Sequence, residues 1–406
     1  MTIAVLKETA QGEGRVAATP DTVKKYVSMG ASVQVQTGAG LGASLSDDAF
    51  TAAGATIAKD ANTTVKGADV VLCVQRPDID TLERLEKGAI LVGLLSPYQF
   101  TDAVPRFERT GASAVSLELV PRITRAQSMD VLSSQANLAG YRAVIEGAAA
   151  FGRAFPMMMT AAGTVAPAKV FVMGAGVAGL QAIATARRLG AVVSATDVRP
   201  AAKEQVQSLG ASFVMVENEE TKAAETSGGY AKEMSEDYKR QQAALVAETI
   251  KKQDIVITTA LIPGRPAPIL VTEDMVKSMK PGSVIVDLAV EAGGNCPLSE
   301  RGKIVEKHGV KIIGYHNLTS HIAVDASALY AKNVLNILTL MFDKEAKKFV
   351  FKFDDDIIKG VTLMHDGKPV HASLVSKDKK ADAAPVAPAD SKSSFKRKAD
   401  TNKKED

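Results

Sequence analysis

The sequence predicts an α/β fold of two domains, each built on a parallel β-sheet, with long helices joining them. Short apolar segments alternate with amphipathic ones along most of the chain, which is typical of parallel strands connected by helices. A chain of 406 residues is also too long for one compact core. Two long segments without turn signals, 134–155 and 326–341, flank the second series of strands. We therefore expect the chain to leave the first domain, build the second and return.

The first series of elements lies within the first 120 residues. Thr19 and Pro20 are residue types preferred at a helix N-cap and first turn, so a helix is expected to start there. Apolar runs predict buried strands at 3–6, 32–36, 70–74, 89–95 and 113–119, and the segments between them predict helices at 20–29, 46–53 and 101–109.

The second series begins after the long segment 134–155, which Pro156 is expected to end. Strands are predicted at 170–173, 191–196, 212–216, 254–259, 283–289 and 310–314. We assign residues 1–133 together with 326–375 to the first domain and residues 134–325 to the second. The segment 376–406 is rich in Lys, Ala and Pro and is expected to be a disordered, charged tail.

The most specific motif is GAGVAG at 174–179, directly after the apolar run 170–173. Gly174, Gly176 and Gly179 have the G-x-G-x-x-G spacing of a dinucleotide-binding turn. The first glycine allows the tight turn, the second lets backbone N–H groups approach a pyrophosphate, and the third lets the helix lie close to the sheet. We therefore predict two Rossmann-like domains, the second of which binds a dinucleotide.

Asp197, at the end of the next predicted strand, indicates which dinucleotide binds. Its carboxylate can accept hydrogen bonds from both hydroxyls of the adenosine ribose. A 2'-phosphate at about 4 Å would be repelled by roughly 1–4 kcal/mol, depending on the local dielectric. NAD(H) is therefore favoured over NADP(H). Arg199 could hold a 2'-phosphate, but we interpret it as a solvated loop charge near the pyrophosphate or adenine.

Two polar segments are candidates for the remainder of the site. Residues 121–134 carry two arginines, an amide, an acid and several hydroxyls just before the first long helix, and such groups could hold a nicotinamide. Residues 217–240 form a longer connection than a compact fold needs. Gly228 and Gly229 precede Tyr230 there, which favours a mobile lid over a bound ligand; a variable surface insertion is the alternative.

Composition excludes several functions. After Ser376 there are nine Lys/Arg and six Asp/Glu, which account for the whole net charge of +3, so the folded body lacks the basic face of a nucleic-acid-binding protein. No run of about 18 apolar residues indicates a membrane span, and the N-terminus does not resemble a signal peptide. Cys73 and Cys296 adjoin apolar runs and are expected to be reduced packing residues, which favours a cytoplasmic setting.

Four segments resemble a known family. RAQSMDVLSSQANLAGYRAV, FPMMMTAAGTV, TTALIPGRPAP and VDLAVEAGGNC are similar to the NAD(H)-binding domain of proton-translocating NAD(P) transhydrogenases, and the resemblance covers about residues 1–375. The resemblance implies nicotinamide contacts by Arg122, Gln127, Asp130 and Ser133, further cofactor contacts by Ser128 and Met129, and pyrophosphate contacts by Ala175, Gly176 and Val177. It further implies adenosine-side contacts by Asp197, Val198 and Arg199, a lid with Gly229 and Tyr230, and cofactor-lining positions at Gln242 and Leu261.

The mechanism implied by this resemblance is direct hydride transfer between NADH on this chain and NADP⁺ on a separate NADP(H)-binding subunit. Such a step needs no metal and no general acid or base, and none of the five histidines falls in the 121–134 segment. The resemblance also implies a homodimer, a membrane-domain subunit as a further partner, and peripheral attachment to the cytoplasmic face of the inner membrane.

Two other functions are compatible with some features of the sequence. Alanine dehydrogenase shares the two-domain design, and Arg15 in GEGRVAATP matches its substrate-carboxylate arginine. That enzyme needs a lysine and a histidine where this chain reads VQRP at 74–77 and LLSP at 94–97, so it lacks an acid/base there. A non-enzymatic NADH-sensing module would explain the glycine turn and Asp197, but it explains the 121–134 segment less well.

Overall fold

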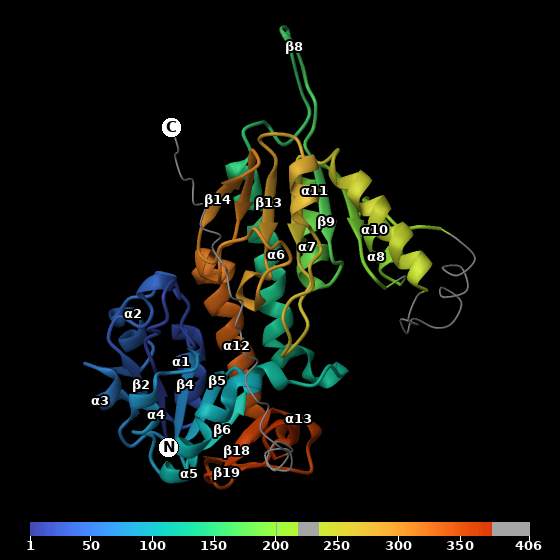
Figure 1. The fold of residues 1–406 in the computed structure, drawn as a ribbon. Helices are drawn as coiled ribbons and strands as arrows, with labels where there is room; N and C mark the ends of the chain where they lie inside the picture. The colour runs from blue at the N-terminus through green and yellow to red at the C-terminus, as the bar shows by residue number, and fades with distance from the viewer. Residues whose placement is uncertain (200, 218–234, 376–406) are drawn as a thin grey trace, which may run out of the picture.

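The computed structural model describes residues 1–199, 201–217 and 235–375. They form two halves, each built around one large sheet, with two long helices running between them (Figure 1). The first sheet has eight strands in the order β19-β18-β6-β5-β4-β1-β2-β3, and the second has seven in the order β11-β10-β9-β12-β13-β15-β14. The predicted α/β class with two Rossmann-like sheets is confirmed.

The first half contains the elements of residues 2–129 and those that follow the second long helix. Its elements before the first long helix are β1 (Thr2–Val5), α1 (Pro20–Ser28), β2 (Ser32–Gln36), η1 (Leu41–Ala43), α2 (Asp47–Ala52), β3 (Ala55–Ala58), α3 (Ala61–Val65), β4 (Val70–Gln75), α4 (Ile79–Leu82), β5 (Ile90–Leu94), η2 (Pro97–Asp102), α5 (Val104–Thr110), β6 (Ser113–Ser116), η3 (Leu117–Leu119) and η4 (Thr124–Met129). The returning elements are β16 (Phe342–Asp343), β17 (Lys348–Phe349), α13 (Asp356–Val361), β18 (Thr362–His365), β19 (Lys368–Pro369) and α14 (Ala372–Val375).

The second half lies between the long helices α6 (Val131–Ala150) and α12 (Ala323–Met341). Its elements are β7 (Met158–Thr160), β8 (Gly163–Val165), β9 (Lys169–Met173), α7 (Val177–Arg188), β10 (Val192–Thr196), α8 (Ala202–Ser208), β11 (Ser212–Phe213), α10 (Glu236–Ile250), β12 (Ile255–Thr258), α11 (Glu273–Ser278), β13 (Val284–Asp287), η5 (Val290–Ala292), β14 (Ile304–Lys307), β15 (Val310–Ile313) and η6 (Leu318–Ile322).

Both sheets are parallel except at one edge. Strands β18 and β19 extend the first sheet in antiparallel pairing, and β14 pairs antiparallel with β15 in the second. Buried apolar side chains cover both faces of each sheet. Successive residues of a strand point to opposite faces. In β4, for example, Val70 and Leu72 pack in one cluster, and Val71 and Cys73 pack in another. In each sheet the strand order reverses beside the first strand, at β1/β4 and β9/β12, where α/β proteins bind ligands.

The return of β18 to the edge of β6 links the end of the described chain to its beginning. Helices α6 and α12 start at Val131 and Ala323, which is two to three residues before the predicted boundaries 133/134 and 325/326. We therefore propose the division into residues 1–133 with 326–375, and residues 134–325, because each set of residues contributes to one sheet.

Helices α6 and α7 are in close contact at Gly140, where the two backbones leave no space for a side chain. A Cβ atom on Gly140 would overlap the carbonyl oxygen of Ala178, and a Cβ on Gly147 would crowd Ile255 and Val286. Glycine is required at the first position because a methyl group has no space there. The same helix contacts η3 of the first half and β13 of the second.

Several sequence predictions differ from the structure. The first long helix starts at Val131 and ends at Ala150, so Pro156 does not end it. Phe151 is extended instead, and Phe151 and Phe155 are buried in the second half, so tertiary packing decides where the helix stops. The structure also contains β3, β14 and the hairpin β7–β8, which the apolar pattern did not indicate.

The segment 217–240, predicted to be a loop, is helical at its C-terminal end, since α10 begins at Glu236. Residues 218–234, with Gly229 and Tyr230, lie outside the described residues, as does the tail 376–406. Thr19 caps α1 with a capping box, as its sequence predicted. Cys73 and Cys296 are both free and buried, also as predicted.

Within the residues that the structure describes, no helix has the length and apolar character needed to cross a bilayer. The hairpin β7–β8 projects from the second half (Figure 1). Met157, Met158 and Met159 at its first strand are 61%, 43% and 78% exposed. The hairpin therefore carries exposed apolar side chains on an isolated pair of strands.

Replacing Gly140 by Ala should destabilise the fold, because the added methyl group must push α6 away from α7. Overpacking of this kind costs about 1–3 kcal/mol. Urea unfolding would measure this loss of the free energy of unfolding. Gly152→Ala is the matched control, because no atom lies within 4 Å of its Cβ position. Equal stabilities of the two variants would contradict the close-contact explanation.

Candidate nucleotide-binding site

The glycine turn between β9 and α7 has the three features that its sequence predicted. Gly174 has a φ of +107°, which favours glycine. A Cβ on Gly179 would overlap the carbonyl oxygen of Gly174, so the helix lies against the turn. The Cβ position of Gly176, by contrast, has no atom within 4 Å. This turn therefore leaves open space beside the N-terminus of α7, where backbone N–H groups favour an anion.

The segment predicted to hold the nicotinamide forms the short helix η4 and the start of α6. Asp130 caps α6, and its carboxylate accepts hydrogen bonds from the backbone N–H of Ser133 at 2.9 Å and from the Ser133 hydroxyl. This cap orients both side chains at the helix N-terminus. Arg125 forms a bidentate ion pair with Asp355, at 2.7 and 2.9 Å, which attaches η4 to α13.

One cavity of about 640 Å³ brings the two segments together. Its volume falls in the range of small-molecule and cofactor sites. Eight predicted site residues line it: Arg122, Gln127, Asp130, Ser133, Ala175, Gly176, Val177 and Arg199. The structure therefore places the glycine turn and the polar loop on the walls of one cavity, although more than 40 positions separate Ser133 from Gly176 in the sequence.

Asp197 does not line this cavity but pairs with Arg199, which does. Its carboxylate accepts the N–H of Ala175 at 2.7 Å and is held by the Arg199 guanidinium at 2.9 and 3.0 Å. Burial favours the neutral acid, but these hydrogen bonds outweigh it and hold the pKa of Asp197 below its ordinary value. Arg199, rather than Asp197, is the member of the pair that lines the cavity.

The remaining predicted residues have different places. Gly174 and Gly179 shape the turn, and Met129 packs in the core of the first half. Val198 is 85% exposed next to the Asp197–Arg199 pair. The Gln242 side chain on α10 bonds Thr196, Val214 and Val216, which joins α10 to the strand before Asp197. Residues that line the cavity but were not predicted are Pro121, Ile123, Thr124, Leu180 and Gln205.

Leu180 could have been found, because it lies three residues after Val177 and therefore on the same face of α7. Pro121, Ile123 and Thr124 belong to the predicted polar segment itself. Gln205 on α8 has no comparable sequence signal, since only the fold brings α8 to the cavity. In the described ranges, no group of three or more His, Cys, Asp or Glu side chains could hold a metal ion.

A second, smaller cavity of about 340 Å³ lies where the two halves meet, and about half of its lining side chains are apolar. Leu261, predicted as a cofactor-lining residue, lines this cavity and not the larger one. Arg15, Gln75 and Asn317 form its polar end. His316 also lines it and bonds the carbonyl of Gln11 at 3.2 Å.

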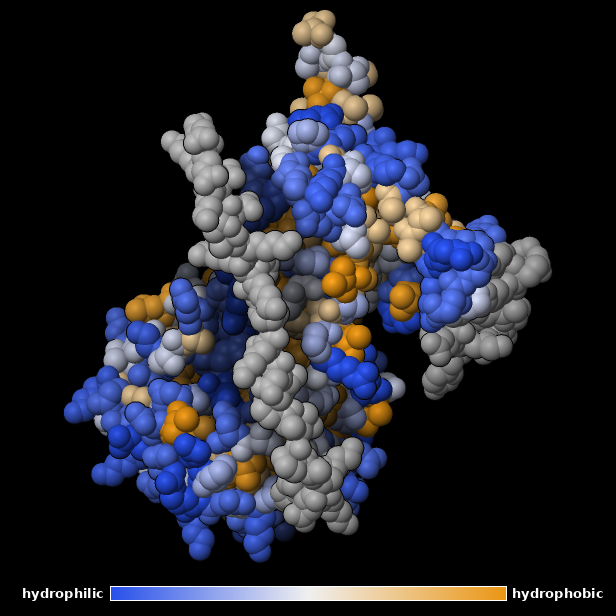
Figure 2. Space-filling view, viewed as in Figure 1, coloured by the Kyte–Doolittle hydropathy of each residue, from blue (hydrophilic) through white to orange (hydrophobic). Residues whose placement is uncertain are grey.

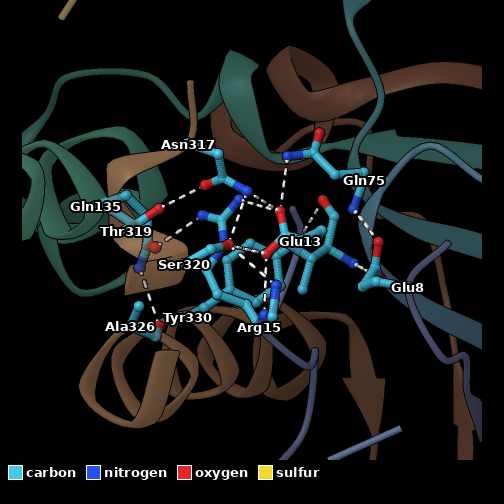
Figure 3. A network of polar contacts seen from close by, with 12 residues as sticks. Glu8, Glu13, Arg15, Gln75, Gln135, Asn317, Thr319, Ser320, Ala326 and Tyr330 are labelled. Atoms are coloured by element: carbon cyan, nitrogen blue, oxygen red, sulfur yellow. Dashed lines mark hydrogen bonds and ion pairs between the residues drawn. The ribbon is translucent and has the colours of Figure 1, made fainter. Parts of the chain in front are cut away.

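A buried network occupies that polar end (Figure 3). The Glu13 carboxylate accepts hydrogen bonds from Arg15 at 2.6 and 2.8 Å, from Asn317 at 2.7 Å and from Ser320 at 2.8 Å. Arg15 also donates to Gln135 on α6 at 2.9 Å. The buried Glu13–Arg15 ion pair therefore connects the loop after β1 to helix α6 and to η6.

Two carboxyl groups of this network have shifted pKa values in opposite directions. Burial raises the pKa of Glu8 to about 7, although the backbone N–H groups of Val74 and Gln75 donate to it. Burial acts in the same sense on Glu13, but the hydrogen bonds and charge of Arg15 outweigh it and lower the pKa of Glu13 to about 2. Glu13 is therefore the ionised partner of Arg15 at neutral pH.

Comparison with known proteins adds family membership to this geometry. The family model "Alanine dehydrogenase/PNT, N-terminal domain" matches residues 4–139, and "Alanine dehydrogenase/PNT, C-terminal domain" matches residues 143–372. An NAD(P) transhydrogenase subunit alpha protein of Rhodospirillum rubrum is 58% identical over 379 residues, which cover 92% of this chain and 99% of that protein. The chain belongs to the NAD(P) transhydrogenase alpha-subunit family.

Other members and relatives agree with this assignment. The corresponding protein of Rickettsia prowazekii is 47% identical, with 91% of this chain and 96% of that protein covered. A solved transhydrogenase from Sinorhizobium meliloti has a TM-score of 0.83 at 53% identity, covering 91% of this chain and all of that one. An L-alanine dehydrogenase structure, at 24% identity and a TM-score of 0.77 over 94% of this chain and 99% of that one, has the same fold. Membership in the transhydrogenase alpha-subunit family makes this chain a nicotinamide-nucleotide-binding oxidoreductase component.

Gly176→Ala should impair nucleotide binding without destabilising the fold, because the new methyl group would extend into open space beside α7. We expect the Kd for NADH to rise about ten-fold or more, which corresponds to about 1.4 kcal/mol. Fluorescence titration and thermal unfolding measure the two effects separately. Gly179→Ala should instead cause a large loss of thermal stability, because its methyl group would overlap the carbonyl oxygen of Gly174. Unchanged NADH affinity in Gly176→Ala would contradict the assignment of the turn.

The Glu8 carboxyl should make stability fall as the pH rises. The pKa of Glu8 is about 7 in the folded protein, against 4.5 for an ordinary glutamate, so between these values the folded state binds more protons than the unfolded one. The free energy of unfolding therefore declines from about pH 5 to pH 7, by roughly 2–3 kcal/mol from this group.

Urea unfolding at several pH values would measure this decline, and Glu8→Gln should abolish it. Glu13 does not contribute to the change, because its stabilisation is present above pH 4.5 and is lost only as the pH falls toward 2. The exposed Glu108→Gln serves as control and should keep the wild-type slope. A slope that persists in Glu8→Gln would show that another group causes it.

Proposed function

We propose that this chain binds NAD(H) and exchanges a hydride between NADH held here and NADP⁺ held by a separate subunit of a proton-translocating transhydrogenase. The observation that carries the proposal is the single cavity lined by both the glycine turn and the segment with Arg122, Gln127, Asp130 and Ser133. Backbone N–H groups of the turn would bind the pyrophosphate. The polar segment offers an amide, a carboxylate and hydroxyl groups that would hydrogen-bond the carboxamide of the nicotinamide.

The residues present fit a dinucleotide. Open space at Gly176 leaves room for phosphate oxygens near the N-terminus of α7. Asp197 and Arg199 stand at the adenosine end, and the ionised carboxylate of Asp197 disfavours a 2'-phosphate. When bound, the nicotinamide supplies the hydride chemistry. We therefore favour NAD(H) over NADP(H) as the nucleotide of this chain.

The composition of the cavity wall suits hydride exchange. Among the described residues that line it, the ionisable side chains are Arg122, Asp130 and Arg199, and histidine is absent. Direct hydride transfer needs two rings in close, oriented contact with water excluded, and it needs no local proton transfer. The protein groups then act by orienting the carboxamide, with Gln127 and Asp130 as the orienting residues. Tyr230 remains our candidate for a lid residue.

The partners follow from the same proposal. The glycine turn and the polar segment provide for one nucleotide, so the second nucleotide must arrive on an NADP(H)-binding subunit, and proton movement requires a membrane-domain subunit. Exposed Leu261, Ile262 and Ile269, at 57%, 45% and 62%, lie in the loop that reaches Tyr98 of the first half and offer an apolar docking surface. In Figure 2 hydrophobic residues are visible on the hairpin and between the two halves. We propose that two copies of this chain associate through the exposed hairpin β7–β8 to form a homodimer. We further propose that this homodimer attaches peripherally to the cytoplasmic face of the inner membrane.

Amino-acid dehydrogenation is disfavoured by the second cavity. The Arg15 guanidinium, which would bind a substrate carboxylate, already donates to Glu13 and Gln135. The chain reads VQRP at 74–77 and LLSP at 94–97, the segments where the resemblance to alanine dehydrogenase leads us to expect a lysine and a histidine, and neither segment contains the expected residue. Without an ionisable acid/base at these positions, proton transfer to an amino-acid substrate has no route.

The direct test mixes the purified chain with an NADP(H)-binding transhydrogenase subunit and follows hydride exchange between labelled NADH and NADP⁺. Exchange that requires both proteins supports the proposal. Nucleotide binding without exchange would favour an NADH-sensing module instead. NAD-linked oxidation of alanine by the chain alone would favour the dehydrogenase.

Gln127→Asn should slow hydride exchange by about ten-fold or more, because the shorter amide no longer reaches the position from which it orients the ring. The Kd for NADH should change by less than about three-fold. Single-turnover kinetics and fluorescence titration supply the two values. Gln207→Asn, on the exposed face of α8, is the control. Equal effects on rate and affinity would make Gln127 a simple binding contact.

Asp197→Ala should weaken NADH binding and improve NADPH binding, because it removes the repelling carboxylate and frees Arg199 to pair with a 2'-phosphate. We expect the NADH/NADPH preference to fall by about ten-fold or more. The double variant Asp197→Ala/Arg199→Ala should lose the gain for NADPH while keeping the loss for NADH. Titrations with both nucleotides measure this, and an unchanged preference in Asp197→Ala would refute the role of the pair.

A further inference from the structure

Two side-chain amides from α12 converge on one carbonyl group of the polar segment. Asn333 Nδ2 and Asn336 Nδ2 each lie 2.8 Å from the carbonyl oxygen of Ser128. The two residues are three positions apart and therefore share one face of the helix. More than 200 positions separate them from Ser128 in the sequence.

These bonds satisfy a group that the local structure leaves without a partner. Ser128 is near the end of η4, where the last carbonyl groups of a helix have no intrahelical donor. The N–H of Asp130 donates to the carbonyl of Gln127, at 3.3 Å. A carbonyl oxygen has two lone pairs, and the two asparagines supply one donor for each at Ser128.

Asn333 joins three elements at once. Its side chain is buried, its amide donates to Ser128 in η4, and its Oδ1 accepts the Ser134 hydroxyl of α6 at 2.7 Å. The junction between η4 and α6, where Asp130 caps the helix, is therefore held from one side by α12. The Arg125–Asp355 ion pair attaches the other end of η4 to α13.

We propose that Asn333 and Asn336 are positioning residues for the nicotinamide: they fix the carbonyl of Ser128 and thereby hold the preceding residue, Gln127, toward the cavity. The proposal rests on the proposed function. Gln127 is joined directly to Ser128 through the backbone, so a rotation of the Ser128 backbone would turn Gln127 away from the cavity wall. The C-terminal region of the chain thus acts on the nucleotide site without touching it.

The test replaces the donor by an acceptor of the same shape. Asn336→Asp and Asn333→Asp each remove the NH₂ group that donates to Ser128, and the double variant removes both hydrogen bonds; Asn333→Asp still accepts the Ser134 hydroxyl. Lys332→Gln is the matched control, because it lies exposed on the same helix and changes the charge by the same single unit. We expect hydride exchange to fall about ten- to a hundred-fold in the variants, as for other small displacements of a positioning group, and not in the control.

Two further readouts separate positioning from a purely structural role. The Kd for NADH should change by less than about three-fold, so that rate and affinity respond differently. The side-chain amide resonance of Gln127, followed by NMR in protein labelled with ¹⁵N-glutamine, should shift on NADH addition in the wild type and in Lys332→Gln, and much less in the Asp variants.

A variant that keeps the wild-type rate and Gln127 shift would overturn the proposal, and so would a loss of thermal stability with no change in the ratio of rate to affinity. The NMR readout does not depend on hydride exchange. Absence of exchange in the wild type would therefore overturn the proposed function, while the Gln127 shift would still decide whether the asparagines position that residue.

Discussion

The close contact between α6 and α7 at Gly140 and Ala178 determines the shape of the nucleotide-binding cavity. Because Gly140 has no side chain, the backbone of α6 reaches the first turn of α7, whose preceding glycines form one wall. Asp130 caps α6 ten residues before Gly140, roughly 15 Å along the helix axis, and Ser133 lies seven residues before it, roughly 10 Å along the axis. Helix α6 thus sets the separation between the proposed phosphate end and the proposed nicotinamide end of the site.

The two cavities differ in how their polar groups are used. In the smaller one, Glu13 and Arg15 satisfy each other, and the rest of the network shares their remaining hydrogen bonds. A buried ion pair gives little net stability, yet breaking one partner is costly, so this network favours a fixed arrangement of the two halves. In the larger cavity, Gln127, Arg122 and the open space at Gly176 face the lumen. Ligand chemistry is therefore expected in the larger cavity and mechanical support in the smaller one.

The pair of Asp197 and Arg199 combines both roles. The guanidinium lowers the pKa of the Asp197 carboxyl group and so keeps it ionised, and the carboxylate in turn holds the arginine. Under the proposed function, selectivity against a 2'-phosphate depends on this mutual bond and not on one charge alone. Gln242 supports the same strand from α10, so the end of β10 is held on both sides.

The sequence by itself determined the local features of this protein. The glycine spacing at 174–179, the acid at 197 and the polar segment before the long helix are encoded by neighbouring residues, because turns, caps and strand ends depend on short-range geometry. Tertiary structure decided everything that depends on distant residues: the end of α6 at Ala150, where Phe151 and Phe155 enter a core; the placement of Arg199, and not Asp197, on the cavity wall; and the assignment of Leu261 to the smaller cavity. The asparagines that hold Ser128 had no sequence signal either, since an amide in a helix is informative only when the fold shows which carbonyl it meets.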